Sequence, residues 1–109
     1  MLGFDGGRAV GCLYLQVDDD AFWPAALVHE ALYVHRLAVL RSEAGRGWSR
    51  RLLDWAADEA RRRGRVCLRL DTELRPKLIA LYESTGFVCV DEEPITVGTH
   101  KVVRFERRV

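Results

Sequence analysis

Residues 37–53, LAVLRSEAGRGWSRRLL, carry the clearest structural signal in this chain. An apolar, strand-like run leads into two closely spaced glycines, Gly45 and Gly47, and then directly into the pattern of an amphipathic helix. Glycine leaves no side-chain bulk beside the backbone, so a ligand can approach the main-chain N–H groups of this turn. The helix also begins with N–H donors that lack a partner within the helix. The stretch predicts either a ligand-binding turn or an ordinary strand–helix connection.

The charges around the turn favour a bound anion. Arg46, Arg50 and Arg51 surround the start of the helix, where no Asp or Glu occurs. The helix dipole favours negative charge at this end by roughly 0.3–1 kcal/mol per group, so arginines fit here when a negative ligand binds between them. Free amides with nearby arginine form a phosphate site. Neither GxxxxGK[ST] nor the third glycine of GxGxxG is present, which excludes a Walker loop and disfavours a dinucleotide turn.

The segment resembles the acetyl-CoA motif of the GNAT superfamily of N-acetyltransferases. In that family a strand of the form L-x-V leads through R/Q-x-x-G-x-G/A into a helix. The matching residues here are Leu37, Ala38, Val39, Gly45 and Gly47, with Ser49 where Gly or Ala is usual. Ala44 replaces the usual Arg or Gln, and Arg46 or Arg50 can supply the positive charge that an Arg would carry there.

Residues 81–87, LYESTGF, resemble a second GNAT segment, L-Y-E-x-x-G-F, in which a helix ends in glycine and its Tyr faces the CoA sulfur. The resemblance implies an α/β (α+β) fold: a mixed, mostly antiparallel sheet with a central parallel strand pair, flanked by helices. The family's first strand and first two helices have no counterpart here. We therefore expect residues 1–109 to form a single, N-terminally short GNAT domain.

Hydrophobic periodicity and turn residues predict the individual elements. Gly6-Gly7 predicts a hairpin turn, and residues 87–90 and 101–105 are expected to form the closing strands. Strict alternation in the third strand predicts that His35, Leu37 and Val39 share one face. The expected strands are 2–4, 9–17, 31–40, 66–71, 87–90 and 101–105, and the expected helices are 48–63 and 76–86.

Composition limits the function classes. A length of 109 residues suits one domain, and a net charge of +1 gives no general attraction to nucleic acid or membrane. No apolar run approaches the roughly 20 residues of a membrane span, and the N-terminus lacks a signal pattern. Cys12, Cys67 and Cys89 are isolated in apolar runs, so we expect buried, reduced thiols, no metal site and a cytoplasmic protein.

The resemblance implies acetyl-CoA as co-substrate and assigns its binding residues. The strand backbone at Leu37, Ala38 and Val39 pairs with the pantetheine arm, and a strand amide near Leu37 or Val39 stabilises the oxyanion. The amides of Gly45, Arg46, Gly47, Trp48, Ser49 and Arg50 bind the pyrophosphate. Arg75 occupies the place of a family Asn that contacts CoA.

Acetyl transfer to an amine requires proton movement, because an alkyl amine with a pKa of about 10.4 is almost fully protonated at pH 7. Asp71 is the first candidate base, with a role in the following loop as the alternative. His35, which can equally be a core or surface histidine, and Glu73 come next. Tyr82 is expected to hydrogen-bond the departing thiolate, as the resemblance implies.

The predicted acceptor is a primary amine of a small molecule or peptide. Acidic loops at 18–20 and 91–93 suit a cationic amine, and simple solvated loops are the alternative reading. A non-catalytic acyl-CoA-binding or interaction module is the alternative function. An open strand edge would also allow a homodimer.

Overall fold

The computed structural model describes residues 2–5, 8–17, 19, 22–23 and 30–109. The element order agrees with the sequence-based expectation apart from additional short elements. The elements are β1 (Leu2–Asp5), β2 (Arg8–Gln16), β3 (Ala31–Val39), a 3-10 turn (Arg41–Glu43), α1 (Trp48–Arg62), β4 (Cys67–Glu73), α2 (Pro76–Ser84), β5 (Val88–Cys89), β6 (Ile95–Val97) and β7 (His100–Arg108).

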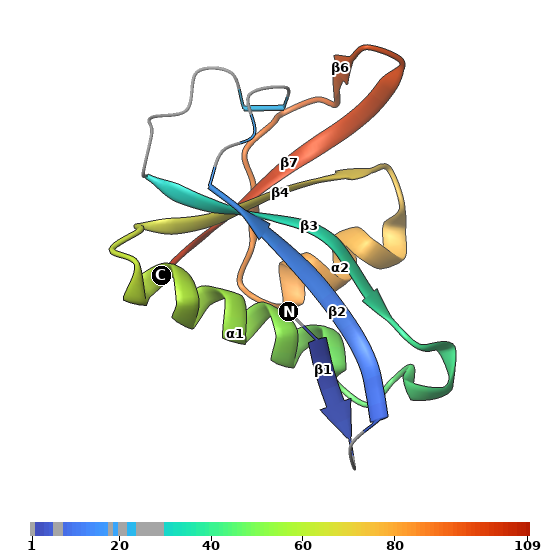
Figure 1. The fold of residues 1–109 in the computed structure, drawn as a ribbon. Coiled ribbons are helices and arrows are strands. Elements are labelled where there is room, and N and C mark those ends of the chain that lie inside the picture. Colours follow the sequence, from blue (N-terminus) through green and yellow to red (C-terminus); the bar gives the residue numbers. More distant parts are fainter. Residues whose placement is uncertain (1, 6–7, 18, 20–21, 24–29) are drawn as a thin grey trace.

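The strands form one seven-stranded sheet in the order β1-β2-β3-β4-β7-β5, with β6 paired to β7. Only β3 and β4 are parallel, and they are joined by α1; the other pairings are antiparallel. Figure 1 shows this crossover helix lying across the sheet, with α2 beyond it. The predicted mixed sheet with a central parallel pair is confirmed.

The main core lies between the helices and one face of the sheet. Helix α1 contributes a buried stripe whose three- and four-residue spacing places all its members on one side: Leu52, Leu53, Ala56, Ala57 and Ala60. They pack against Leu13, Leu32, Leu68 and Phe105 from the strands. Three of the stripe residues are alanines, so the helix backbone approaches the sheet closely there.

The opposite face of the sheet carries a smaller cluster built around a buried cation. Arg69 is 9% exposed and donates hydrogen bonds to Glu30 at 2.7 Å, Glu106 at 2.9 Å and the Tyr33 hydroxyl at 3.1 Å. Its guanidinium also lies 5.0 Å from the centre of the Trp23 ring. Burial opposes the charged form, but these hydrogen bonds outweigh it and raise the pKa of Arg69.

Some sequence-based expectations were incomplete or wrong. Strand β6 lies between the expected strands 87–90 and 101–105 and pairs with β7, and β4 extends to Glu73 instead of ending at 71. The expected strand 87–90 is shorter in the structure, because β5 covers only Val88 and Cys89. Cys89 is exposed on this edge strand, so the expectation of a buried thiol there was wrong. Cys67 is buried as expected, whereas Cys12 is partly buried.

Several expectations lie outside the described residues: the Gly6-Gly7 turn and, in the acidic loop, Asp18 and Asp20. Within the described part of the chain, the helices are too short and too polar to cross a membrane.

Replacing Arg69 by Met should lower the free energy of unfolding by about 3 kcal/mol, because it leaves two carboxylates without their cation. This is the low end of the range for buried pairs, since Glu30 and Glu106 keep 31% and 25% exposure. Urea denaturation measures the change. Arg61→Met, which breaks only an exposed ion pair with Asp58, should change stability by less than about 1 kcal/mol. Equal losses in the two variants would contradict a special role for Arg69.

Candidate active site

Strand β3 contains a β-bulge at Arg36. Its pairing with β2 joins Cys12 to Ala38 but Tyr14 to His35, so β3 advances three residues where β2 advances two. Arg36 adopts φ 52°, the left-handed conformation that costs a non-glycine residue roughly 1–2 kcal/mol. Strained backbone of this kind is held in place by its surroundings and gathers at functional sites.

The bulge changes which side chains share a face. Beyond it, Leu37 and Val39 pack against the same core as Leu32 and Val34, beneath the helices. The expectation that His35 and Leu37 lie on one face was therefore wrong. Strict alternation holds only in a regular strand, and the extra residue of the bulge shifts the following side chains to the other face.

The central parallel pair separates next to the bulge. Pairing of β3 with β4 ends at Tyr33 and Arg69, after only three residue pairs. Beyond that point β3 stays with β2, whereas β4 stays with β7 to its end. Figure 1 shows the two strands diverging. Among the described residues, each strand therefore presents to the gap an edge that has no partner strand.

A cavity of about 750 Å³ occupies this gap. Its walls come from both separated strands, from α2 and from β7. The lining residues are Phe22, Arg36, Leu37, Asp71, Thr72, Glu73, Arg75, Leu78, Tyr82, His100 and Val102. Three predicted site residues from three elements, Asp71, Tyr82 and Leu37, thus meet in one cavity, with Arg75 and Glu73 beside them.

The glycine turn lies at the start of α1. Gly45 and Gly47 both adopt φ 78°, and a Cβ at either position would meet no atom of the described residues within 4 Å. Gly47 is the N-cap residue, no side chain caps the helix, and its first turn contains no acid. A second cavity of about 320 Å³ lies here, lined by Val39, Leu40, Ala44, Gly45, Gly47, Trp48, Ser49, Arg50 and Leu81. The turn thus offers uncapped amides beside open space, which suits a phosphate.

The arginines of this turn have different surroundings. The Arg50 guanidinium donates a 2.9 Å hydrogen bond to the Ser84 carbonyl, which ties the start of α1 to the end of α2. Arg51 lies 4.9 Å from the centre of the Trp48 ring. At the other cavity, the exposed Arg75 lies 3.7 Å from the Glu73 carboxylate. Because Arg50 and Arg51 already contact other groups, an anion bound at the glycine turn would depend first on the main-chain N–H groups.

Asp71 and Tyr82 both have raised pKa values. Burial raises the pKa of Asp71, and nearby Asp19 raises it further, against the opposing effects of His35 and His100. Burial, followed by the Asp71 charge, raises the pKa of Tyr82, which is 7% exposed. A carboxyl group with a raised pKa is a stronger base than an ordinary one, and perturbed groups in a cleft indicate a functional site.

His35 lies beside this cavity rather than in its wall. It lines a neighbouring space of about 350 Å³ with Tyr14, Leu15, Gln16 and Arg36. Its Nε2 atom is buried, has no hydrogen-bond partner among the residues that the structure describes, and lies 3.7 Å from the Asp19 carboxylate. The geometry favours an electrostatic influence on Asp71 over direct contact with a substrate in the large cavity.

Sequence reasoning missed several residues of the site. Phe22 and His100 line the large cavity, and Arg36 provides the bulge. No local motif marks any of the three, since their positions follow from strand pairing between distant segments. The predicted acidic loop at 91–93 is not in the cavity lining. The Asp91 side chain is only 6% exposed and is bound to Arg104, so Asp91 itself is not a freely solvated carboxylate.

Comparison with known proteins identifies the family of the chain. The model of the acetyltransferase (GNAT) family matches residues 1–87. The chain therefore belongs to the GNAT acetyltransferase family, whose co-substrate is acetyl-CoA. No curated protein sequence matches the chain.

Solved structures share the fold. A GNAT family acetyltransferase from Elizabethkingia anophelis, with acetyl-CoA bound, is similar with a TM-score of 0.78 at 18% identity, over 99% of this chain and 74% of that one. The IAA acetyltransferase from Bacillus cereus ATCC 14579 is similar with a TM-score of 0.77 at 20% identity, over 99% of this chain and 75% of that one. The ribosomal-protein-S18-alanine N-acetyltransferase from Escherichia coli is similar with a TM-score of 0.72 at 23% identity, over 97% of this chain and 65% of that one. The chain spans three quarters or less of these relatives' own lengths.

The strain at Arg36 predicts that glycine is more stable than alanine at this position, the reverse of the usual order in a strand. Because its φ is positive, Arg36→Gly should be about 1 kcal/mol more stable than Arg36→Ala. At Lys101, an exposed β7 residue without positive φ, alanine should instead be better by about 0.5–1 kcal/mol. Urea denaturation of the four variants measures both differences. The same preference at both positions would show that the bulge is absent in solution.

Proposed function

We propose that this chain is an acetyl-CoA-dependent N-acetyltransferase that acts on a primary amine of a small molecule or peptide. The acetyl group moves by direct attack in a ternary complex. The observation that carries the proposal is the gap between β3 and β4, where Asp71 and Tyr82 share a cavity. Family membership supports acetyl transfer in general. We also propose that residues 1–109 form one domain, since a single sheet contains strands from both ends of the chain.

The chain's backbone provides the acetyl-CoA site. Acetyl-CoA supplies the thioester, and its extended pantetheine arm pairs with the open edge of β3 at Leu37, Ala38 and Val39. Its pyrophosphate binds the uncapped amides that run from Gly45 to Arg50. The positive φ of the two glycines and the space beside them support this assignment. Arg75, at the start of α2, contributes positive charge at the cavity rim.

The open edge of β3 also serves the reaction. As the amine nitrogen bonds to the thioester carbon, negative charge develops on the carbonyl oxygen. An amide near Leu37 or Val39 donates to that oxygen, and one such donor is worth about 3 kcal/mol. The donor belongs to the backbone, so side-chain substitution at these positions changes packing more than it removes the hydrogen bond.

Asp71 accepts the proton of the attacking amine, directly or through water. Its raised pKa makes it a better base than an ordinary carboxylate, and its place in the cavity wall gives it access to the acceptor. His35 supports it from the adjacent space, and Glu73 is a second carboxylate at the same rim. Since Asp71 acts deprotonated, turnover falls as the pH drops through its pKa.

Tyr82 stabilises the departing sulfur. When the carbon–sulfur bond breaks, CoA leaves as a thiolate, to which the Tyr82 hydroxyl donates a hydrogen bond. The raised pKa of Tyr82 keeps the phenol protonated for this role. A phenol near pKa 10 is a weaker acid than a thiol near 8.5, so a hydrogen bond is favoured over complete proton transfer.

Acetyl-CoA should stabilise the chain in thermal melting, whereas adenosine should not. At 100 times the dissociation constant, a ligand that binds only the native state adds about 2.7 kcal/mol to the free energy of unfolding.

Gly47→Ala should weaken acetyl-CoA binding about 10-fold, because a Cβ in this backbone conformation strains the turn that presents the amides. Calorimetric titration of both proteins measures the affinity.

Gly64→Ala is the matched control. Gly64 also has a positive φ, 72°, and open space beside it, but it follows the other end of α1. Both substitutions should reduce stability by about 1 kcal/mol, and only Gly47→Ala should reduce affinity. Equal affinities in the two variants would contradict a phosphate site at the glycine turn.

Tyr82→Phe should lower turnover about 10-fold or more while leaving acetyl-CoA affinity unchanged, because the hydroxyl acts on the leaving thiolate. Thiol release in the presence of an amine found by acceptor screening measures the rate. Tyr14→Phe, on the exposed side of β2, is the control. An unchanged rate in Tyr82→Phe would remove the assigned role. Tight acetyl-CoA binding without turnover on any amine would favour a non-catalytic acyl-CoA-binding module.

A further inference from the structure

The two charged pairs that face each other across β4 and β7 behave differently. The antiparallel register places Arg69 opposite Glu106 and Asp71 opposite Arg104. Directly opposed residues project from the same face of a sheet, close enough to form ion pairs. Arg69 and Glu106 do so, at 2.9 Å. Among the described residues, however, no ion pair joins Arg104 to Asp71.

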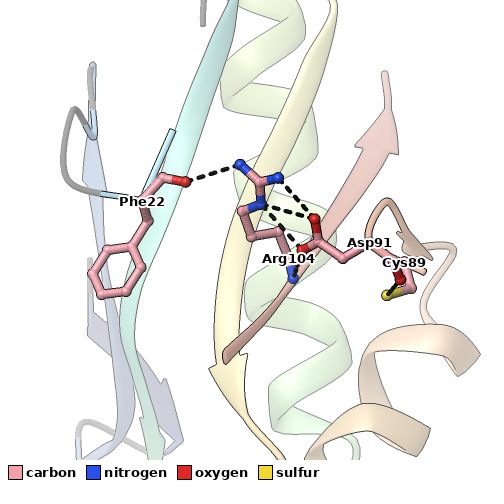
Figure 2. A network of polar contacts seen from close by, with 4 residues as sticks. All are labelled: Phe22, Cys89, Asp91 and Arg104. Carbon is pink, nitrogen blue, oxygen red and sulfur yellow. Dashed lines mark hydrogen bonds and ion pairs between the residues drawn. The ribbon is translucent and has the colours of Figure 1, made fainter. Parts of the chain in front are cut away.

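Arg104 is held by Asp91 instead. Its Nη2 lies 2.7 Å from one Asp91 oxygen, and its Nε lies 3.2 and 3.1 Å from the two carboxylate oxygens. The Arg104 backbone N–H also donates to Asp91 at 2.9 Å. The carboxylate thus binds both the backbone and the side chain of one residue. Figure 2 shows the guanidinium turned toward Asp91.

The remaining nitrogen of Arg104 reaches the cavity wall. Its Nη1 donates a 3.1 Å hydrogen bond to the carbonyl of Phe22, a residue that lines the large cavity. The guanidinium also lies 4.9 Å from the centre of the Trp23 ring, next to Phe22 in sequence. A planar, forked cation suits these simultaneous contacts in a way that a lysine would not.

We propose that Asp91 is a positioning residue for the active site: it holds Arg104 against Phe22 and away from the carboxylate of Asp71. The inference rests on the proposed function, in which Asp71 must be unpaired to receive a proton. An arginine ion-paired with Asp71 would stabilise the carboxylate and weaken it as a base. Asp91 thereby fixes the position of Phe22 in the cavity wall through Arg104. It also leaves Asp71, which lies opposite Arg104 on β4, free to accept a proton.

The charged and titratable groups around Asp71 come from every element packed against it. Asp19 precedes the Phe22–Trp23 segment, His35 and Arg36 lie on β3, Glu73 lies on β4, Arg75 and Tyr82 lie at the start and within α2, and His100 and Arg104 lie on β7. The hydrogen bond from Arg104 lowers the pKa of Asp91. The 2.7 Å ion pair places the charge of the guanidinium against the Asp91 carboxylate.

The test is a pH titration of the Asp71 carboxyl carbon by ¹³C NMR in protein labelled at aspartate, with the signal assigned through Asp71→Asn. In Asp91→Asn, Arg104 is released, and the Asp71 midpoint should fall by about 1–3 pH units. In the double variant D91N/R104M the cation is also absent, and the midpoint should return to the wild-type value. Glu92→Gln, which removes an adjacent exposed carboxylate, should leave it unchanged.

Each outcome decides the proposal. A wild-type midpoint in Asp91→Asn overturns it, because released Arg104 then does not reach Asp71. A midpoint in D91N/R104M more than one pH unit above wild type also overturns it, since Arg104 would already stabilise Asp71 in the native protein. The double variant leaves neither buried charge unpaired, so it decides the question if Asp91→Asn does not fold. The titration needs no acceptor, so full turnover by Asp71→Asn would refute the proposed base while leaving this geometry intact.

Discussion

The separation of β3 from β4 is the constraint on which the rest of the site depends. A parallel pair in the middle of a sheet normally keeps its backbone groups bonded, because unpaired buried N–H and C=O groups are costly. Here the pairing stops after Tyr33 and Arg69, and the bulge at Arg36 rotates the remainder of β3. The open strand edges and the cavity between them follow from that break.

The two faces of the sheet support the break in different ways. Beneath the helices, apolar packing of α1 and α2 holds each separated strand through Leu37, Val39 and Leu70. On the other face, hydrogen bonds and ring contacts connect Arg69 and Arg104 to their partners and to Trp23. Charge-assisted hydrogen bonds from a forked guanidinium fix the geometry of the groups that they join. The apolar face stabilises the fold, and the charged face orients the groups around the gap.

Much of the fold could be predicted from the sequence, because local signals specify it. The alanine-rich stripe of α1, the glycines at its ends and the LYESTGF segment all produced the expected elements. The candidate site was predicted only in part. Asp71 and Tyr82 lie on regular elements and meet in one cavity. The bulge at Arg36, the role of Phe22 and the capture of Arg104 by Asp91 arise from long-range pairing, which leaves no periodic pattern in the sequence.

Amide hydrogen exchange with and without acetyl-CoA tests the central claim most directly. If the open edge of β3 is where the pantetheine arm binds, the amides of residues 37–39 and of the turn at 45–50 should become protected on addition of acetyl-CoA. Amides in the centre of β7, which are already paired with β4, should change little. Protection elsewhere, with residues 37–39 unchanged, would contradict the account, because acetyl-CoA would then bind without using the gap between the strands.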